Sequence, residues 1–231
     1  MTAPDRAQTP MQPSISADAI RLLELRDLDA IWALQRRVRA SLQDPTFLAD
    51  DPHEFFEAHL SAWGCIGGVE QEGELVAFGV LGLGARVPAE ENFGRLIGLP
   101  ADRLATVGQP DGVAVLGQWR GRGLQKLLLR WRLERAKAQG CRDILSTCEP
   151  RNRISLRNMM SFGMRAVKFD YLFGGLPRVV LHKDLTGDAP VDRTKAQVVP
   201  MLPDSLSKAF ERGFVGIDLV EGGLLMAPVS N

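Results

Sequence analysis

Hydrophobic positions in the first hundred residues predict a strand, two helices and a hairpin, in that order. Apolar residues recur at helical spacing after the first strand, and Asp27 stands where a helix cap is needed. A second helix opens at Asp51 or Pro52, and two apolar runs flank the turn at Gln71–Gly73. The predicted segments are 20–25 (strand), 27–42 and 51–62 (helices), and 65–69 and 75–83 (hairpin strands).

The second half of the chain repeats this pattern around a glycine-rich turn. Val113–Leu116 is a short β-branched and aliphatic run, which is typical of a buried strand. After the turn, several leucines and Trp131 recur at helical spacing. The further predicted segments are 141–148 (strand), 152–163 (helix with a glycine cap), and 166–173 and 178–185 (strands). Together these segments predict a mixed α/β sheet of about seven strands with four helices.

The two ends of the chain differ in character. Residues 1–17 are rich in Pro, Ser and Thr and lack the apolar core of a signal peptide, so we expect a disordered segment and a cytoplasmic protein. Residues 186–231 follow the last strand and predict a helix from Asp204 to Arg212 and a hairpin over 214–226. This C-terminal extension either covers the edge of the sheet or packs on a partner subunit.

Composition predicts a soluble globular protein with one sizeable core. The chain has 231 residues, 45% of them hydrophobic, and no apolar run approaches the length of a membrane span. The formal net charge is zero, so no overall field draws the protein to nucleic acid. Basic residues concentrate in 120–142, but aromatic residues suited to base stacking are not interleaved with them. We therefore expect no nucleic-acid partner and no membrane association.

The turn that follows Val113–Leu116 has the properties of an anion site. The first N–H groups of the next helix have no partner inside the helix, and the helix dipole is positive at that end. Gly121 and Gly123 carry no Cβ, so a phosphate group can approach the backbone closely. Arg120 and Arg122 add positive charge beside it. These residues predict a pyrophosphate cradle.

Two well-known phosphate motifs do not fit this turn. A Walker loop requires Lys-Ser/Thr where Leu124 and Gln125 stand, and a dinucleotide fingerprint requires a third glycine where Lys126 stands. The segment Gln118–Gly123 instead resembles the Q/R-x-x-G-x-G/A signature of the GNAT superfamily, the acyl-CoA-dependent N-acyltransferases. Only the register that starts at Gln118 fits fully, because one that starts at Arg120 needs a small residue at Gln125.

A second segment strengthens the resemblance. The superfamily has an Asn, then Ser or Ala three residues later, and Gly-Phe at the end of the same helix. Asn152 and Ser155 match this pattern, whereas Gly163-Met164 departs from it at the second residue. The resemblance covers residues 18–185 and implies a mixed, mostly antiparallel central sheet flanked by helices.

The resemblance also implies an acyl-CoA site. In the superfamily the strand before the motif separates from its neighbour, and its last residues pair with the pantetheine arm. Asn152 is then expected near the pantetheine and Ser155 near the adenosine diphosphate end. The alternative role for Val113 and Val115 is core packing, and the alternative role for Asn152 is helix capping. The residues expected to bind acetyl-CoA are Val113, Ala114, Val115, Gln118, Arg120, Gly121, Arg122, Gly123, Leu124, Gln125, Asn152 and Ser155.

An acceptor amine must be neutral to attack a thioester. A free alkylamine has a pKa near roughly 10.4, so a base or a desolvating pocket has to remove its proton. Asp111, at the start of the central strand, is the first candidate base, acting directly or through water. Glu149, at the tip of the next strand, is the second. A backbone N–H near Val115 is expected to hold the oxyanion.

The general acid is the clearest departure from the family pattern. The superfamily usually places a tyrosine seven residues after the Asn to protonate the leaving thiolate, and here that position is Met159. The chain has one tyrosine, Tyr171, which either substitutes as the acid or packs with its hydroxyl satisfied. Because a thiol has a pKa of about 8.5, thiolate is a tolerable leaving group without an acid.

Three further features of the sequence bear on its chemistry. Residues 85–109 form a long connection with a short helix at 101–106, which is either an acceptor-binding lid or a structural insertion. Cys148 at a strand end either carries an acyl group or is a buried, inert thiol. His53 and His59 are spaced so that they cannot share one helical face, so we expect no metal site.

We therefore expect an acetyl-CoA-dependent N-acetyltransferase that moves an acetyl group to a primary amine by direct attack in a ternary complex. The alternative is an acyl-CoA-binding sensor or partner module with degraded catalysis, which Met159 favours. The expected partners are acetyl-CoA and an amine acceptor. Whether the chain forms a homodimer is left open.

Overall fold

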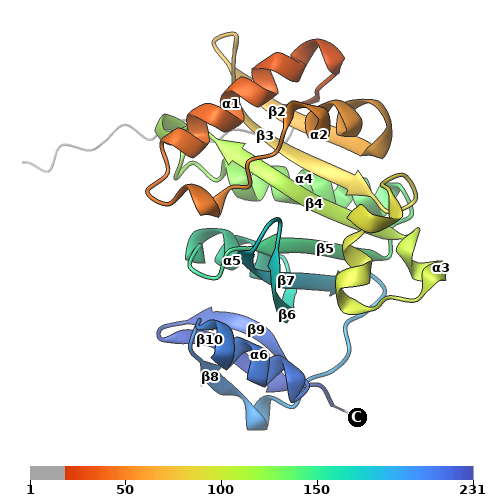
Figure 1. The fold of residues 1–231 in the computed structure, drawn as a ribbon, viewed down its shortest axis with the longest axis vertical. Coiled ribbons are helices and arrows are strands. Elements are labelled where there is room, and N and C mark those ends of the chain that lie inside the picture. The colour runs from red at the N-terminus through yellow and green to blue at the C-terminus, as the bar shows by residue number, and fades with distance from the viewer. Residues whose placement is uncertain (1–18, 231) are drawn as a thin grey trace, which may run out of the picture.

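One mixed sheet organises the chain (Figure 1). The computed structural model describes residues 19–230, so the segment 1–17, expected to be disordered, lies outside the described residues. Within the described range ten strands pair in the order β1-β2-β3-β4-β5-β7-β6-β9-β10-β8. The strands are β1 (Ile20–Leu22), β2 (Gly64–Gln71), β3 (Glu74–Leu83), β4 (Val107–Val115), β5 (Asp143–Cys148), β6 (Arg165–Leu172), β7 (Leu176–Asp184), β8 (Gln197–Val199), β9 (Phe214–Val220) and β10 (Gly223–Pro228).

Helices cover both faces of the strands β2 to β4: α1 and α2 lie on one face and α4 on the other (Figure 1). Phe78 of β3 packs edge-on against Phe56 of α2, with ring centroids 5.6 Å apart. A Cβ at the neighbouring Gly79 would lie 3.1 Å from Arg132 of α4, because successive strand residues point to opposite faces. The helices of the described part are α1 (Leu28–Ala40), α2 (His53–Ala58), α3 (Ala101–Leu104), α4 (Leu124–Ala138), α5 (Arg153–Met160) and α6 (Pro203–Glu211).

The strands β4 and β5 are parallel and lie together only at their first residues. Val107 pairs with Asp143 and Gly108 with Ile144, and no later residue of either strand pairs with the other. The other described neighbours in the sheet are antiparallel, as the family resemblance implies. The sheet therefore opens between β4 and β5 toward their carboxyl ends.

The strand β4 begins at Val107, so the predicted strand at Val113–Leu116 was too short at its start. In the sequence, Gly108 and Pro110 suggest a turn and not a strand, because the proline nitrogen cannot donate a hydrogen bond to a neighbouring strand. A bulge accommodates the proline: Pro110 pairs with Leu81 of β3, and the next paired residue of β4 is Val113. The connection after β3 is correspondingly shorter than predicted, and it contains two 3₁₀ turns before α3.

The C-terminal extension continues the sheet of its own chain, which is why the sheet has ten strands and not about seven. Its helix α6 and hairpin β9–β10 lie where the sequence predicts them, and the short strand β8 is additional. The sheet is joined at one pair, Ala166 of β6 with Gly216 of β9. A Cβ at Gly216 would lie 2.8 Å from the Ala166 Cβ, so this close approach requires glycine.

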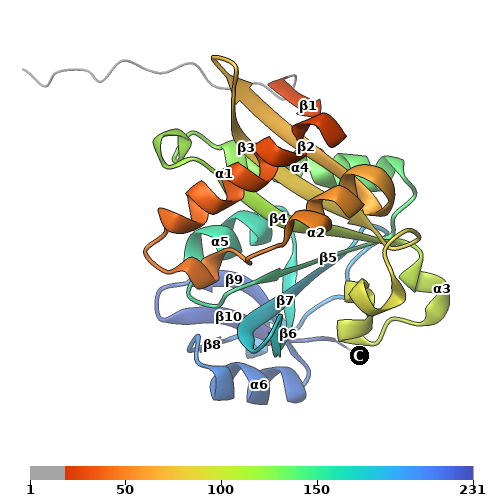
Figure 2. The ribbon, with the colours of Figure 1, turned by 45° about the horizontal axis from the view of Figure 1, so that its top comes forward.

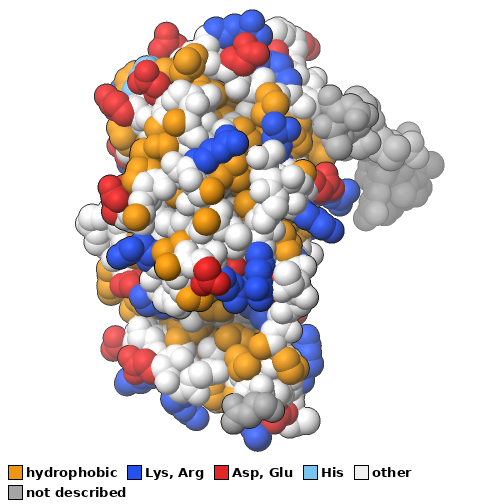
Figure 3. Space-filling view, turned by 90° about the vertical axis from the view of Figure 1, so that its right-hand side faces the viewer, with side chains coloured by type: hydrophobic (Ala, Val, Ile, Leu, Met, Phe, Trp, Pro, Cys, Tyr) orange, Lys and Arg blue, Asp and Glu red, His pale blue; other side chains and the backbone are white. Residues whose placement is uncertain are grey.

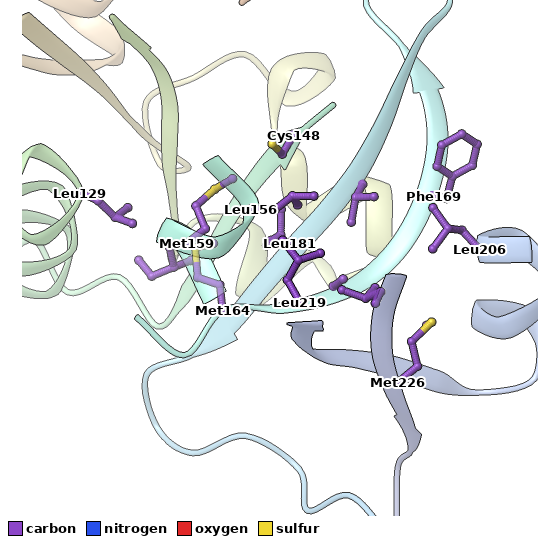
Figure 4. Close-up of a cluster of buried hydrophobic side chains, with 14 of the residues drawn as sticks. Leu129, Cys148, Leu156, Met159, Met164, Phe169, Leu181, Leu206, Leu219 and Met226 are labelled. Carbon is purple, nitrogen blue, oxygen red and sulfur yellow. The ribbon is translucent and has the colours of Figure 1, made fainter. Parts of the chain in front are cut away.

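A shared hydrophobic core fixes the extension in place. Leu206 of α6, Leu219 of β9 and Met226 of β10 belong to the same buried cluster as Leu156 and Met159 of α5 (Figure 4). Figure 2 shows α6 and the strands β8 to β10 together at one end of the molecule. Of the two predicted roles for this segment, the structure shows that it covers the sheet's edge.

The surface of the described part has two plain properties. None of the helices within residues 19–230 is long and apolar enough to cross a bilayer. On the face drawn in Figure 3, Lys and Arg side chains are interspersed with Asp and Glu side chains.

Candidate active site

A bulge in β4 and the buried hydroxyl group of Ser146 border the opening between β4 and β5. Ser146 of β5 donates a hydrogen bond of 2.6 Å from its Oγ to the carbonyl oxygen of Pro110. This bond bridges the two strands just after their backbone pairing ends. Asp111 and Gly112 occupy the bulge that follows, where β4 changes direction. The Asp111 side chain consequently lines the opening.

The glycine turn after β4 has the geometry that a phosphate cradle needs. Gly121 and Gly123 adopt φ of 76° and 79°, in the left-handed region that favours glycine. A Cβ at either position would meet no atom within 4 Å, so the space beside the backbone is open. Gly123 is the residue that precedes α4, so this open space adjoins the N-terminus of a 15-residue helix, whose first N–H groups have no partner inside the helix.

The two arginines of the turn are held in place by local contacts. Arg120 donates to the carbonyl oxygen of Val115 at 3.1 Å and to Ser41 Oγ at 3.1 Å. The Arg122 guanidinium lies 4.3 Å from the centre of the Trp119 ring and donates to the Gln118 carbonyl. These contacts place two cations beside the start of α4.

The two motif helices α4 and α5 are tied together by Gln125. Its Nε2 donates to Ser155 Oγ at 3.1 Å, and its Oε1 accepts from Asn158 Nδ2 at 2.6 Å. Asn152 caps α5 by accepting from the Ser155 N–H at 3.1 Å. Asn152 therefore fills the capping role that the sequence offered as an alternative, and it also lines the cavity described next.

A cavity of about 1300 Å³ joins the cradle to the opening between the strands. Of the predicted acetyl-CoA-binding residues, nine line it and three do not. The buried Ala114 side chain points into the core on the other face of β4, and the exposed Gln118 and Arg122 side chains lie outside the cavity. The nine that line it are Val113, Val115, Arg120, Gly121, Gly123, Leu124, Gln125, Asn152 and Ser155.

Asp111 lies at the inner end of this cavity with a second carboxylate, Asp51, which sequence reasoning missed as a functional residue. Burial, followed by the negative charge of Asp51, raises the pKa of Asp111 to about 7. Burial raises the pKa of Asp51 to about 6, with a smaller contribution from the charge of Asp50. A Cβ at Gly112 would lie 3.5 Å from Asp51 Oδ2, which places Asp51 against the bulge of β4.

Arg132 of α4 supports the same bulge from beneath. Its buried guanidinium donates to the carbonyl oxygen of Val80 at 3.3 Å and to that of Asp111 at 3.0 Å. Burial lowers the pKa of Arg132 to about 10, and the Asp111 charge opposes this shift. Arg132 thus binds the Asp111 backbone and leaves the Asp111 side chain facing the cavity.

Glu149, the second candidate base, lines the cavity but has its carboxylate already engaged. Its Oε2 accepts from the backbone N–H groups of Arg151 and Asn152, at 2.6 and 3.1 Å, and its Oε1 accepts from Arg151 Nε at 2.6 Å. Three hydrogen bonds therefore hold the Glu149 carboxylate in the turn before α5, and Asp111, whose side chain faces the cavity, is the better placed of the two candidate bases.

The connection after β3 contributes to the cavity wall. Glu91 and Phe93 line the cavity, and both are anchored by Gln109 of β4. The Gln109 side chain donates to the Glu91 carbonyl at 3.1 Å and accepts from the Phe93 N–H at 2.8 Å. Part of the predicted lid is therefore a fixed wall next to Asp111.

Comparison with known sequences decides the family. The profile of the family described as acetyltransferase (GNAT) family matches residues 31–164, more than half of the chain. The chain belongs to this family. No curated protein matches it in sequence.

Several solved structures share the fold. An N-acetyltransferase from Staphylococcus aureus Mu50 is 21% identical with a TM-score of 0.54, and the match covers 72% of this chain and 97% of that one. Arabidopsis thaliana NAA60 in complex with acetyl-CoA is 16% identical with a TM-score of 0.57, over 73% and 98%. The protein yncA from Salmonella typhimurium with its cofactor acetyl-CoA is 19% identical with a TM-score of 0.54, over 75% and 96%.

This GNAT protein lacks a tyrosine at the site. Tyr171 on β6 is 57% exposed, packs edge-on against Phe169 and does not line the cavity. This position favours the packing role that the sequence offered as the alternative to acid catalysis. Met159 does line the cavity and is 6% exposed within the hydrophobic cluster of Figure 4. A thioether supplies no proton.

Proposed function

We propose that this GNAT protein transfers an acetyl group from acetyl-CoA to a primary amine by direct attack in a ternary complex. One observation carries the proposal: a single cavity joins an open helix N-terminus to a buried aspartate whose pKa lies near neutrality. Two relatives in fold, NAA60 and yncA, are solved with acetyl-CoA. Membership of the family supports acetyl transfer in general, and the role of each residue is proposed from its position in this chain.

Acetyl-CoA is proposed to lie between the cradle and the opened edge of β4. The pyrophosphate accepts hydrogen bonds from N–H groups of the segment Arg120–Gln125. The pantetheine arm pairs with the Val113–Val115 backbone on the edge away from β3, where no strand is paired with it. Asn152 and Ser155 border the arm and the adenosine diphosphate end.

Asp111 is proposed to act as the general base, directly or through one water molecule. A base is most effective when its pKa lies near the working pH, and the Asp111 pKa of about 7 meets that condition. The amine nitrogen attacks the thioester carbonyl carbon, and its proton passes to the Asp111 carboxylate. A backbone N–H near Val115 stabilises the oxyanion.

Collapse of that intermediate breaks the carbon–sulfur bond and releases coenzyme A as a thiolate. Thiolate is an adequate leaving group because thiols have a pKa of about 8.5. The release therefore needs no protein acid, which fits the methionine at position 159. The proton held by Asp111 returns to solvent and the carboxylate is restored.

The alternative is an acyl-CoA-binding sensor without turnover, and Met159 in place of tyrosine favours it. Release of free thiol from acetyl-CoA, measured with a panel of amines, separates the two. Turnover with any primary amine, lost in Asp111→Asn, supports the transferase. Tight acetyl-CoA binding by calorimetry with no thiol release from the whole panel supports the sensor.

A further inference from the structure

Arg178 of β7 is a buried cation on the cavity wall that the proposed reaction does not use. Its side chain is 4% exposed. It donates from Nη1 to the carbonyl oxygen of Pro177 at 3.0 Å and from Nη2 to that of Thr46 at 3.1 Å. Within residues 19–230, no carboxylate oxygen lies within 4.0 Å of its guanidinium. A guanidinium carries five N–H donors, so most of its donors have no protein acceptor.

A buried charge without a counterion is costly, and proteins rarely keep one without a use. Burial lowers the pKa of Arg178, and the negative charges around the cavity oppose this shift without forming an ion pair with it. The nearby acid Glu149 does not serve as a partner, because its oxygens are taken by Arg151 and the N–H of Asn152. A ligand anion is the missing partner that this arrangement accommodates.

Arg178 lines the same cavity as Asp111, and the part of the cavity that these residues share is called the acceptor side. Phe173, in the turn between β6 and β7, lies with its ring centre 5.9 Å from the guanidinium and 6.2 Å from the ring of Phe93. Phe173 adopts φ of 50°, a strained conformation for a bulky residue that is often found at functional sites. These aromatic rings give the acceptor side an apolar wall.

The opposite charge is available in the same space. The negative charges of Asp51 and Asp111 act on Arg178, so the three groups lie within electrostatic reach of one another. Asp111 is the group placed to receive an ammonium proton, and Arg178 is the group placed to bind an anion. A ligand with an amine at one end and an anion at the other satisfies both.

We propose that the acceptor is a free amino acid, whose carboxylate pairs with Arg178 while its α-amine faces Asp111. A planar guanidinium with free N–H groups matches a carboxylate in a two-bond geometry. A peptide or protein N-terminus lacks that carboxylate and leaves Arg178 unpaired. This inference rests on the proposed function, because that function assigns acetylation to the amine. The carboxylate of the acceptor is inferred from Arg178 alone.

The test compares free amino acids with their amides, which differ only in the anionic group. The wild-type protein is assayed for thiol release with acetyl-CoA and the twenty amino acids, each paired with its amide. For the preferred side chain, kcat/KM for the acid is expected to exceed that for the amide by about tenfold or more, the effect of one charge-assisted pair. In Arg178→Gln the KM for the acid rises and the preference disappears, while kcat/KM for the amide stays nearly constant.

Two further variants keep this test decisive. Arg178→Lys retains the charge and is expected to keep part of the preference, and it serves if the glutamine variant fails to fold. Arg95→Gln removes an exposed arginine outside the cavity and is expected to change nothing.

Binding of the amino acid in the presence of coenzyme A, measured by calorimetry, separates the two proposals. Binding that requires Arg178 without thiol release supports the amino-acid site and refutes the transferase. Thiol release with equal preference for acids and amides supports the transferase and overturns the amino-acid site. Neither release nor binding overturns both.

Discussion

The carboxyl group of Asp111 on β4 shares its cavity with that of Asp51 from the loop before α2, and the Asp51 charge raises the Asp111 pKa. Burial makes the larger contribution, and together they bring the Asp111 pKa to about 7. The two residues come from opposite sides of the β2–β3 hairpin in the sequence. The proximity of these two carboxyl groups and the geometry of the glycine cradle lead to testable predictions.

Replacing a cradle glycine with aspartate should weaken acetyl-CoA binding. In Gly121→Asp or Gly123→Asp the side chain enters the open space and adds a negative charge facing the diphosphate, and the left-handed backbone adds strain of roughly 1–2 kcal/mol. We expect a loss of affinity of at least about tenfold, measured by calorimetry.

The matched control for the cradle is Gly140→Asp. Gly140 follows the other end of α4, with φ of 77° and no atom within 4 Å of a Cβ. The same backbone strain should reduce stability there and leave affinity unchanged. If the cradle variants bind acetyl-CoA as tightly as Gly140→Asp, the diphosphate does not lie at this turn.

Asp111→Asn should remove the general base. We expect kcat to fall by roughly 10²–10⁴-fold, the usual contribution of a positioned base. The wild-type profile of kcat/KM should rise as pH increases through about 7, where the Asp111 carboxyl loses its proton. The variant should lack that step. A variant that keeps the step would show that another group is the base.

Asp51→Asn should move the acidic limb of the pH profile to lower pH. Removing a neighbouring negative charge makes ionisation of Asp111 easier, so its pKa falls from about 7 toward the usual value of an aspartate. The exposed Asp102 on α3 provides the control, and Asp102→Asn should leave the limb in place. An unchanged limb in Asp51→Asn would contradict coupling between the two carboxyls.

The pair should also make folding stability depend on pH. Both folded pKa values, about 6 and about 7, lie above the usual 3.8, so between pH 4 and 7 the folded state holds protons that the unfolded chain has lost. This stabilisation is present below about pH 4 and is lost as pH rises through 6 to 7.

The double variant Asp51→Asn, Asp111→Asn should therefore have a higher Tm than the wild type at pH 8, with about 2–4 °C for each kcal/mol regained. At pH 4 the two proteins should unfold at similar temperatures in a thermal scan. A Tm difference of the same size at both pH values would mean that ionisation is not its cause.

Cys148 should carry no acetyl group during turnover. Burial raises the pKa of its thiol to about 12, so the nucleophilic thiolate is scarce at neutral pH. We expect Cys148→Ala to retain activity within a few-fold. Mass spectrometry of the protein with acetyl-CoA alone should show no added acetyl group, and a stable adduct that disappears in the variant would point to a two-step transfer.

Much of the site was readable from the sequence because it depends on local features. The cradle needs only a strand, two glycines and a helix start in succession, and these occur within one short segment, Val113 to Leu124. Asp111 was identifiable because it lies two residues before the predicted strand segment at Val113. The folded extension was likewise predicted from its caps and apolar pattern.

Other residues gave no signal that sequence reasoning can use. Asp51 precedes a helix and reads as a capping residue, and nothing local pairs it with Asp111. Arg178 is the first residue of the predicted strand 178–185, where a charged residue is not unusual, and its burial without a carboxylate partner is visible only in three dimensions. Tyr171 is a candidate acid on its chemistry alone, and its exposure outside the cavity favours the packing alternative.

The sequence by itself determined the order of the elements, the glycine cradle and membership of a fold family, because these follow from periodicity and backbone conformation over short stretches. Only the tertiary structure decided the chemistry of the cavity. Burial, proximity of charges and the availability of hydrogen-bond partners depend on residues brought together from β4, β7 and the loop before α2. Those quantities set the Asp111 pKa and leave Arg178 unpaired, and no local pattern records them.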